Sequence, residues 1–264
     1  MDLRDRYLSL LSSAITHTLY DPPDTRPLPK EVQESIMEEI LRSGEELVLR
    51  SPQEERAQGR DRPVYAQTMI GTARLANVRR CVESVIRDEV PGDLIEAGAW
   101  RGGAAILMRG VLAAYEDAAR RVWVADSFQG LPKPDAERYP ADASDVNYLA
   151  DELAVPLAEV RANFERYDLL DERVRFVEGW FRDTLPGLSE ESWAVIRLDG
   201  DLYESTMDGL RHLYPNLTVG GYVIVDDFGF DNCREAVEDY RREHGIREEI
   251  ERIDWVGAYW QRRE

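Results

Sequence analysis

The stretch that decides the fold is Asp93-Leu-Ile-Glu-Ala-Gly-Ala-Trp-Arg-Gly-Gly-Ala-Ala-Ile-Leu-Met-Arg109. It begins as an apolar strand at Leu94 and Ile95 and continues as a helix whose apolar residues recur at spacings of three and four. Between the two stand the glycines Gly98, Gly102 and Gly103. Glycines allow a tight turn and leave backbone N–H groups free at the start of the helix, which is typical of a small-molecule cradle. A purely structural strand-to-helix turn is the alternative.

The spacing of these glycines bears on the class of ligand. It is Gly-x-x-x-Gly-Gly, whereas a dinucleotide-binding loop has the pattern G-x-G-x-x-G. That loop also needs small residues where Trp100 and Arg101 stand here. The sequence therefore disfavours a pyrophosphate ligand, and with it a nicotinamide-dependent oxidoreductase.

The composition limits the protein's class and its partners. A chain of 264 residues can bury one large α/β core. Its 52 acidic and 33 basic residues give a net charge of −19, which would repel nucleic acid and anionic membranes. Cys81 and Cys233 both fall where a helical pattern needs a small buried residue, so no disulfide is expected. Because membrane-spanning and signal-peptide patterns are lacking, we expect a cytoplasmic protein.

Further strand patterns follow the glycine loop, and helical patterns separate most of them. The strands are expected at 121–126, 173–179, 193–199 and 220–228, and the helices at about 156–167, 203–214 and 232–244. This alternation predicts an α/β fold with a doubly wound, mostly parallel sheet. Strand-like runs at 247–253 and 258–261 predict a C-terminal antiparallel hairpin.

The first 64 residues differ from the rest of the chain. Amphipathic helices are expected at 2–19 and at about 30–42. Residues from about 44 to 63 are charged and poor in apolar side chains, which predicts a long exposed loop. Such a loop is either a lid over a binding site or a solvated excursion of the surface. We therefore divide the chain into an N-terminal extension, 1–64, and a ligand-binding domain, 65–264.

Two features at strand ends suggest contacts to a nucleoside. Asp126 ends the second strand, where an acid in a doubly wound sheet can accept hydrogen bonds from both hydroxyls of a ribose. Its alternative role is to form a turn ahead of Ser127. Gly179 and Trp180 end the third strand, where a flat aromatic ring can lie against a purine. Trp180 fits a core or lid position equally well.

Acidic residues end the fourth and fifth strands. Because the carboxyl ends of parallel strands share one crevice, Asp199, Asp226 and Asp227 are expected to converge. Three carboxylates repel one another unless a cation lies among them, and oxygen ligands favour Mg²⁺, Mn²⁺ or Ca²⁺. The alternative is that Asp199 or Asp201 caps the following helix and that Asp226 and Asp227 are turn residues.

Together these motifs resemble the TylF-type macrocin O-methyltransferase family, which includes the mycinamicin and novobiocin sugar O-methyltransferases. The likeness covers nearly the whole chain from about Tyr65. Its ordered blocks are Gln-Thr-Met-Ile-Gly, Trp-Arg-Gly-Gly-Ala, Trp-Val-Ala-Asp-Ser-Phe-Gln-Gly, Gly-Trp-Phe, Asp-Gly-Asp-Leu-Tyr, Gly-Gly-Tyr-Val-Ile-Val-Asp-Asp and Cys-Arg-Glu-Ala-Val. The resemblance implies a class I methyltransferase fold, Rossmann-like, with an N-terminal extension that covers the acceptor and supports a homodimer.

The resemblance also implies S-adenosylmethionine and Mg²⁺ as cofactors, and a glycoside of a natural product, methylated on a deoxysugar hydroxyl, as the acceptor. Glu96 would lie near the methionine end of the cofactor. The implied cofactor-binding residues are Thr68, Met69, Glu96, Gly98, Trp100, Arg101, Gly102, Gly103, Asp126, Ser127, Phe128, Gln129, Gly179, Trp180 and Asp199. The implied metal ligands are Asp199, Asp226 and Asp227.

A sugar hydroxyl does not ionise unaided at neutral pH, so methyl transfer needs a positioned base, and a cation that lowers the hydroxyl's pKa helps. Asp199 is the expected base, while the histidines lie in helices away from the crevice. Two alternatives remain: a non-catalytic protein that holds S-adenosylmethionine or a nucleoside, and a metal-dependent O-methyltransferase with a catechol-like acceptor. Three metal-binding aspartates argue against the former.

Overall fold

A computed structural model describes residues 2–19, 25–27, 48–50 and 53–264. Its centre is a seven-stranded sheet in the order β5-β4-β3-β6-β7-β9-β8. The strands are β3 (Asp93–Ala97), β4 (Val122–Asp126), β5 (Val174–Glu178), β6 (Trp193–Leu198), β7 (Leu217–Val225), β8 (Glu251–Arg252) and β9 (Ala258–Gln261). Neighbours from β5 to β7 are parallel, while β9 pairs antiparallel with β7 and β8. The predicted doubly wound sheet and its C-terminal hairpin are confirmed.

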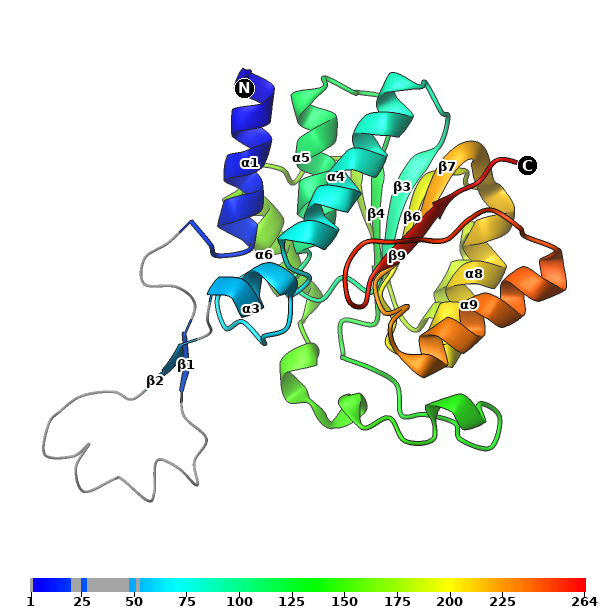
Figure 1. Cartoon of the computed structure of the whole chain (residues 1–264). Helices are drawn as coiled ribbons and strands as arrows, with labels where there is room; N and C mark the ends of the chain where they lie inside the picture. The colour runs from blue at the N-terminus through cyan, green and yellow to red at the C-terminus, as the bar shows by residue number, and fades with distance from the viewer. Residues whose placement is uncertain (1, 20–24, 28–47, 51–52) are drawn as a thin grey trace, which may run out of the picture.

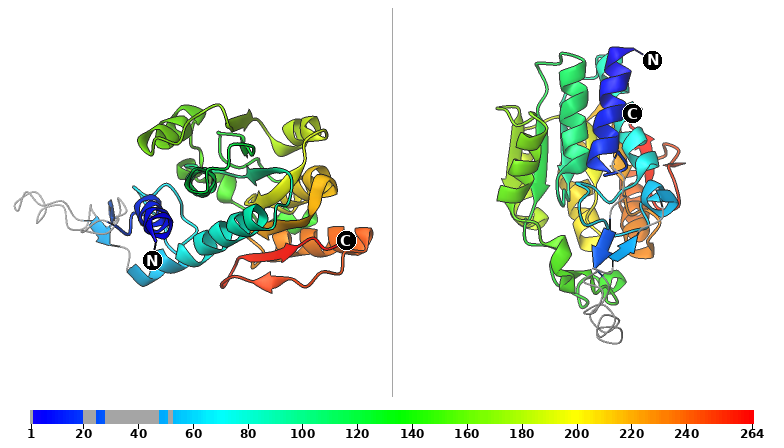
Figure 2. Two further views of the ribbon diagram at one scale, coloured as in Figure 1. Left: turned by 90° about the horizontal axis from the view of Figure 1, so that it is seen from above. Right: turned by 90° about the vertical axis from the view of Figure 1, so that its left-hand side faces the viewer.

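Helices cover both faces of the sheet (Figure 1). One face carries α1 (Leu3–Ile15), α4 (Thr72–Arg87), α5 (Gly103–Ala114) and α6 (Leu157–Arg166). The other carries α7 (Phe181–Thr184), α8 (Tyr203–Leu213) and α9 (Asp231–His244). The β8–β9 hairpin forms one edge of the sheet, as the view from above in Figure 2 shows. The three-layer arrangement leaves the loops at the carboxyl ends of the strands free to form a site.

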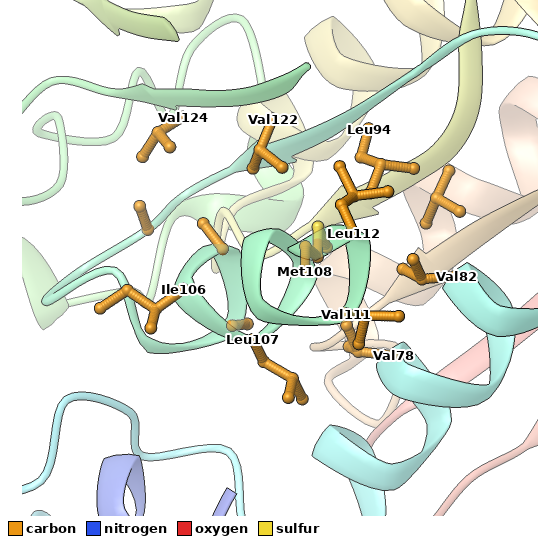
Figure 3. Close-up of a cluster of buried hydrophobic side chains, with 14 of the residues drawn as sticks. Val78, Val82, Leu94, Ile106, Leu107, Met108, Val111, Leu112, Val122 and Val124 are labelled. Carbon is orange, nitrogen blue, oxygen red and sulfur yellow. The ribbon is translucent and has the colours of Figure 1, made fainter. Parts of the chain in front are cut away.

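Each face of the sheet contributes to its own core. Leu94 on β3 and Val122 on β4 belong to the cluster around α5, where Figure 3 shows them near Leu112. Ile95, the next residue along β3, belongs to the cluster on the opposite face. Successive residues of a strand point to opposite faces, so a parallel strand with helices on both sides is apolar throughout. This double burial explains the apolar runs that predicted the strands.

Helix α1 packs along α5 (Figure 1). The Asp2 side chain caps it by accepting a hydrogen bond from the Asp5 backbone N–H. Leu11 lies so close to Gly110 that a Cβ at Gly110 would be 2.3 Å from its Cδ2, so the small residue permits the contact. The predicted helix at 2–19 is present but ends at Ile15. The helix predicted at 30–42 lies outside the described residues.

The prediction of one exposed loop from 44 to 63 is wrong in its described part. Strand β2 (Val48–Arg50) pairs antiparallel with β1 (Thr25–Pro27), and α3 (Gln53–Gln58) follows. Arg56 and Asp61 form an ion pair of 2.9 Å, and both side chains are more than 90 % buried. A buried ion pair gives a segment the composition of a solvated loop, so polarity alone misrepresented it.

Two smaller differences concern the second half of the chain. The strand predicted at 247–253 is limited to the two residues of β8. The loop after β4 contains short 3-10 turns at Pro140–Asp142, Asn147–Leu149 and Asp151–Leu153. Within the described ranges, none of the helices has both the length and the apolar character needed to cross a membrane.

Candidate active site

A cavity of about 360 Å³ opens at the carboxyl ends of the parallel strands. Loops after β3 to β7 line it, together with residues near 59–62 and 68–70 and the turn between β8 and β9. The predicted site residues that line it are Thr68, Met69, Glu96, Gly98, Trp100, Asp126, Ser127, Trp180, Asp199, Asp226 and Asp227. The predicted cofactor residues outside this lining are Arg101, Gly102, Gly103, Phe128, Gln129 and Gly179. The structure thus brings most of the expected residues into one space.

The glycine loop is held against its neighbours by backbone contacts. Gly98 has a φ of +92°, and a Cβ there would lie 1.7 Å from the carbonyl oxygen of Asp199. Only glycine fits both the conformation and the approach. Gly103 is similarly close to the Gln67 carbonyl, at 2.6 Å from a built Cβ. Because Gly98 touches Asp199, the loop lies directly beside the first acid of the predicted metal site.

Asp126 fastens the glycine loop to the end of β4. Its carboxylate accepts hydrogen bonds from the backbone N–H groups of Ala99 at 2.7 Å and Trp100 at 3.3 Å. The Phe128 N–H also donates to it, at 2.7 Å, which is the turn-forming role considered as an alternative. Burial raises the pKa of Asp126, against the effect of these donors. The residue forms the turn and also lines the cavity, so its turn-forming role does not remove it from the predicted ribose site.

Glu96 and Arg101, two of the residues implied to bind the cofactor, have clear roles within the protein. Glu96 is buried, accepts from the Ala105 N–H at 2.9 Å and pairs with Arg197. Burial raises the pKa of Glu96 to about 8. Arg101 donates to the backbone carbonyls of Val64 and Ala66 and so holds the segment before α4. Trp180 is half-buried and lines the cavity rather than lying in a core.

The three predicted metal ligands converge. Asp199, Asp226 and Asp227 each offer an oxygen within 4.8 Å of the others. Two buried arginines lie among them. Arg197 donates to Asp199 at 2.8 Å and to Asp226 at 2.6 Å, and Arg74 pairs with the other oxygen of Asp226. The expected cation among these carboxylates is thus supplied in part by the protein itself, through two arginines that the sequence analysis did not foresee.

The arginines do not compensate every acid. Burial tends to raise the pKa of Asp226, but Arg197 and Arg74 outweigh it and lower the pKa. At Asp199 and Asp227 the pKa is raised, first by burial and then by neighbouring carboxylates. Burial and Asp199 raise the pKa of Asp201 to about 7. The arginines therefore favour the charged form of Asp226, whereas Asp199, Asp201 and Asp227 hold their protons more readily than free carboxyls do.

This donor set fits a divalent cation that prefers oxygen. A carboxylate oxygen that accepts one hydrogen bond keeps a lone pair, so Asp199 and Asp226 can bind a cation while held by arginine. Asp227 accepts one bond, from the Asp201 N–H at 3.1 Å. Three carboxylates without imidazole or thiolate favour Mg²⁺ or a similar hard ion over zinc.

Comparison with known proteins gives the site a family. The model for the macrocin-O-methyltransferase family, TylF, matches residues 4–262. The chain belongs to this family. It is 48 % identical over 260 residues to the 8-demethyl-8-(2,3-dimethoxy-alpha-L-rhamnosyl)-tetracenomycin-C 4'-O-methyltransferase of Streptomyces olivaceus, covering 98 % of this chain and 93 % of the relative. It is 52 % identical over 214 residues to the mycinamicin III 3''-O-methyltransferase of Micromonospora griseorubida, covering 80 % and 84 %.

A solved structure agrees with this assignment. The O-methyltransferase NovP superposes with a TM-score of 0.87 at 47 % identity, over 99 % of this chain and 100 % of that one. The protein is thus an S-adenosylmethionine-dependent O-methyltransferase of the macrocin-O-methyltransferase family. The resemblance drawn from the ordered sequence blocks is confirmed.

The aspartates at the end of β6 in this methyltransferase do not cap α8. That role falls to Asp142, which accepts from the backbone N–H groups of Tyr203 at 2.7 Å and Glu204 at 3.1 Å. The alternative that Asp199 or Asp201 caps the helix is therefore wrong. Asp142 comes from the loop after β4. Because Asp142 caps α8, Asp199 and Asp201 are left to line the cavity.

Several residues that line the cavity of the methyltransferase were absent from the predicted site residues. They are Arg74, Arg197, Asp201, Phe230 and Trp255. Arg197 did have a signal, since it interrupts the otherwise apolar β6, and an arginine that is 99 % buried requires an acidic partner. Arg74 has no comparable signal, because its helix also carries exposed arginines.

Proposed function

We propose that this methyltransferase transfers a methyl group from S-adenosylmethionine to a hydroxyl of a deoxysugar on a glycosylated natural product, with the aid of Mg²⁺. The observation that carries the proposal is the close approach of Gly98 to the backbone carbonyl of Asp199, which brings the proposed donor loop next to the residue that begins the carboxylate cluster. Relatives near 50 % identity are named for methylating a rhamnosylated tetracenomycin and mycinamicin III. A donor site and a deprotonating site in contact are what O-methylation requires.

The cofactor is proposed to lie across the ends of β3, β4 and β5. Asp126 has one oxygen that accepts only the Phe128 N–H, which leaves a lone pair for a ribose hydroxyl. Trp180 offers a ring at the cavity wall after β5, suited to the purine. Thr68, Met69 and Trp100 complete this wall. Arg101, Gly102, Gly103, Phe128, Gln129 and Gly179 act from behind it by holding the loops in place.

The proposed chemistry is an in-line displacement at the sulfonium methyl. The acceptor hydroxyl loses its proton to Asp199 as it attacks, since Arg197 occupies only one oxygen of Asp199. Asp201 also lines the cavity and is a second candidate for the base. Asp199, Asp226 and Asp227 would hold Mg²⁺, which supplies a positive charge that lowers the pKa of a bound hydroxyl.

Residues 1–64 are proposed to cover the acceptor and to support a homodimer. On α1, Leu3 and Leu10 are exposed, whereas Leu8, Leu11 and Ile15 are buried. The same two exposed leucines of a second copy of the chain would be a suitable partner surface for them. Size-exclusion chromatography with light scattering tests this, because Leu3→Glu together with Leu10→Glu is expected to give monomers.

Both cysteines are buried free thiols, as suits a reducing compartment, so we place the reaction in the cytoplasm.

The decisive experiment is a panel of acceptors analysed by mass spectrometry. Deoxysugar glycosides, including α-L-rhamnosides, are incubated with enzyme, S-adenosylmethionine and Mg²⁺. A mass gain of one methyl on the sugar is expected. Methylation of a catechol with no glycoside turned over would instead favour the catechol-like acceptor.

A further inference from the structure

The order of strands places different groups in sequence along the cavity. Residues proposed to hold the cofactor follow β3, β4 and β5, and the carboxylate cluster follows β6 and β7. Beyond β7 comes the β9–β8 hairpin, whose turn carries Trp255. The acceptor must meet the methyl group at the carboxylates, so the space on the β9 side of them is left for the rest of the acceptor molecule.

Two exposed aromatic rings stand in this space. Trp255 is 41 % exposed and Phe230, just before α9, is 44 % exposed, and both line the cavity. Their ring centroids are 6.2 Å apart at an interplanar angle of 83°. Exposed large apolar side chains that converge in a cavity are typical of ligand contact, since leaving them in water costs free energy.

The depths of these side chains in the cavity indicate how a glycoside acceptor would lie in it. Asp226 and Asp227 are buried, whereas Phe230 and Trp255 lie at the rim. A glycoside whose sugar hydroxyl reaches the carboxylates therefore holds its aglycone at the level of the aromatic pair. Resting on the function proposed above, we propose that Trp255 and Phe230 form an aglycone platform, which selects acceptors whose sugar is linked to an apolar ring system.

Trp255 also has a structural contact that must be separated from this role. Its indole N–H donates to the Gln58 carbonyl at 2.9 Å, and the Arg60 guanidinium lies 5.4 Å from its ring centroid. These contacts attach the end of α3 to the hairpin turn. Trp255→Phe removes the hydrogen bond and keeps an aromatic ring, whereas Trp255→Ala removes both.

Two probes that differ only in the aglycone test the platform. Binding of 4-nitrophenyl α-L-rhamnoside and of methyl α-L-rhamnoside is measured by calorimetry with S-adenosylhomocysteine bound, and KM is measured for each. The wild-type protein is expected to prefer the aryl glycoside. Trp255→Ala and Phe230→Ala are each expected to reduce that preference about tenfold, as for the loss of an aromatic contact. The methyl glycoside should be affected little.

The controls distinguish the platform from a general loss of structure and from the proposed reaction. Trp255→Phe should keep most of the aryl preference, and Tyr65→Ala should keep all of it, because Tyr65 is 58 % exposed but does not line the cavity. A wild-type protein without aryl preference, or one whose preference survives both alanine substitutions, overturns the platform. Methylation of the methyl glycoside in that case leaves the proposed reaction standing.

Discussion

The half of the cavity at the ends of β3 to β5 is shaped by backbone, whereas the half beyond β7 is shaped by side chains. In the first, Gly98 has no room for a Cβ and Asp126 is held by three backbone N–H groups. In the second, the exposed rings of Trp255 and Phe230 line the cavity, with the Arg60 guanidinium beside Trp255. A backbone-built wall suits an invariant ligand, while a side-chain wall can be altered without disturbing the fold. We therefore expect the cofactor in the half at the ends of β3 to β5 and the variable acceptor in the half beyond β7.

The largest effect is expected at the boundary between the halves. Asp199→Asn keeps the shape of the residue but removes the basic oxygen and a negative charge, so turnover should fall by about 10² to 10⁴-fold. Affinity for S-adenosylhomocysteine should change little. Steady-state kinetics with calorimetry measures both, and Asp201→Asn provides the comparison between the two candidate bases.

Removal of the divalent metal from the enzyme by chelation is a second test of the proposed mechanism. The native enzyme is expected to lose activity after exhaustive chelation and to regain it with Mg²⁺, because three acids offer oxygens within 4.8 Å of one another. Full activity after chelation would falsify the metal-assisted mechanism and show that the carboxylates need no metal beside Arg74 and Arg197.

The next effect concerns stability. Arg197 is buried and bonds to Glu96, Asp199 and Asp226, so Arg197→Met leaves buried charges without their partner. The free energy of unfolding is expected to fall by about 3 to 5 kcal/mol, measured by urea denaturation. Arg62→Met, at a pair whose side chains are both more than half exposed, is the matched control and should cost at most about 1 kcal/mol. Equal losses for the two variants would contradict the central role of Arg197.

A smaller effect is expected on the backbone-built side. Asp126→Ala should weaken binding of S-adenosylhomocysteine by about 1.5 to 3 kcal/mol in calorimetry, as for loss of a charged acceptor. Asp93→Ala is the control, because Asp93 also ties β3 to β4 through the Arg121 N–H and the Trp123 indole, at the opposite ends of the strands. Unchanged affinity in Asp126→Ala would remove this residue from the ribose site.

The smallest effect is expected in residues 53–62, which contact both halves of the cavity. The sequence suggested a lid ending near Arg62, and in the structure Arg62 reaches Glu152 at 2.6 Å while Trp100 donates to the Glu152 carbonyl. Hydrogen exchange in residues 53–62 should slow when both ligands bind, as expected for closure over an acceptor. Exchange that is equally fast with and without ligands would show that this segment is not a lid.

The sequence by itself determined the sheet, the glycine loop and the convergence of Asp199, Asp226 and Asp227. These depend on patterns within a single strand and turn, and on the rule that parallel strands end together. The described part of segment 44–63 was misjudged because periodicity reports apolar burial and not buried ion pairs such as Arg56 with Asp61. The boundaries of α1 and β8 were also set too widely, since pattern alone does not show where packing ends.

Only the tertiary structure decided which charges and rings meet at the site. Arg74 reaches Asp226 across 152 positions of sequence, and Asp142 caps a helix 61 positions away. Trp255 reaches Gln58 across 197 positions. Such pairs depend on strand order and on the path of loops, neither of which leaves a local pattern. The physical reason is that burial is encoded residue by residue, whereas the partner of a buried or cavity-facing polar group is fixed only when distant elements pack.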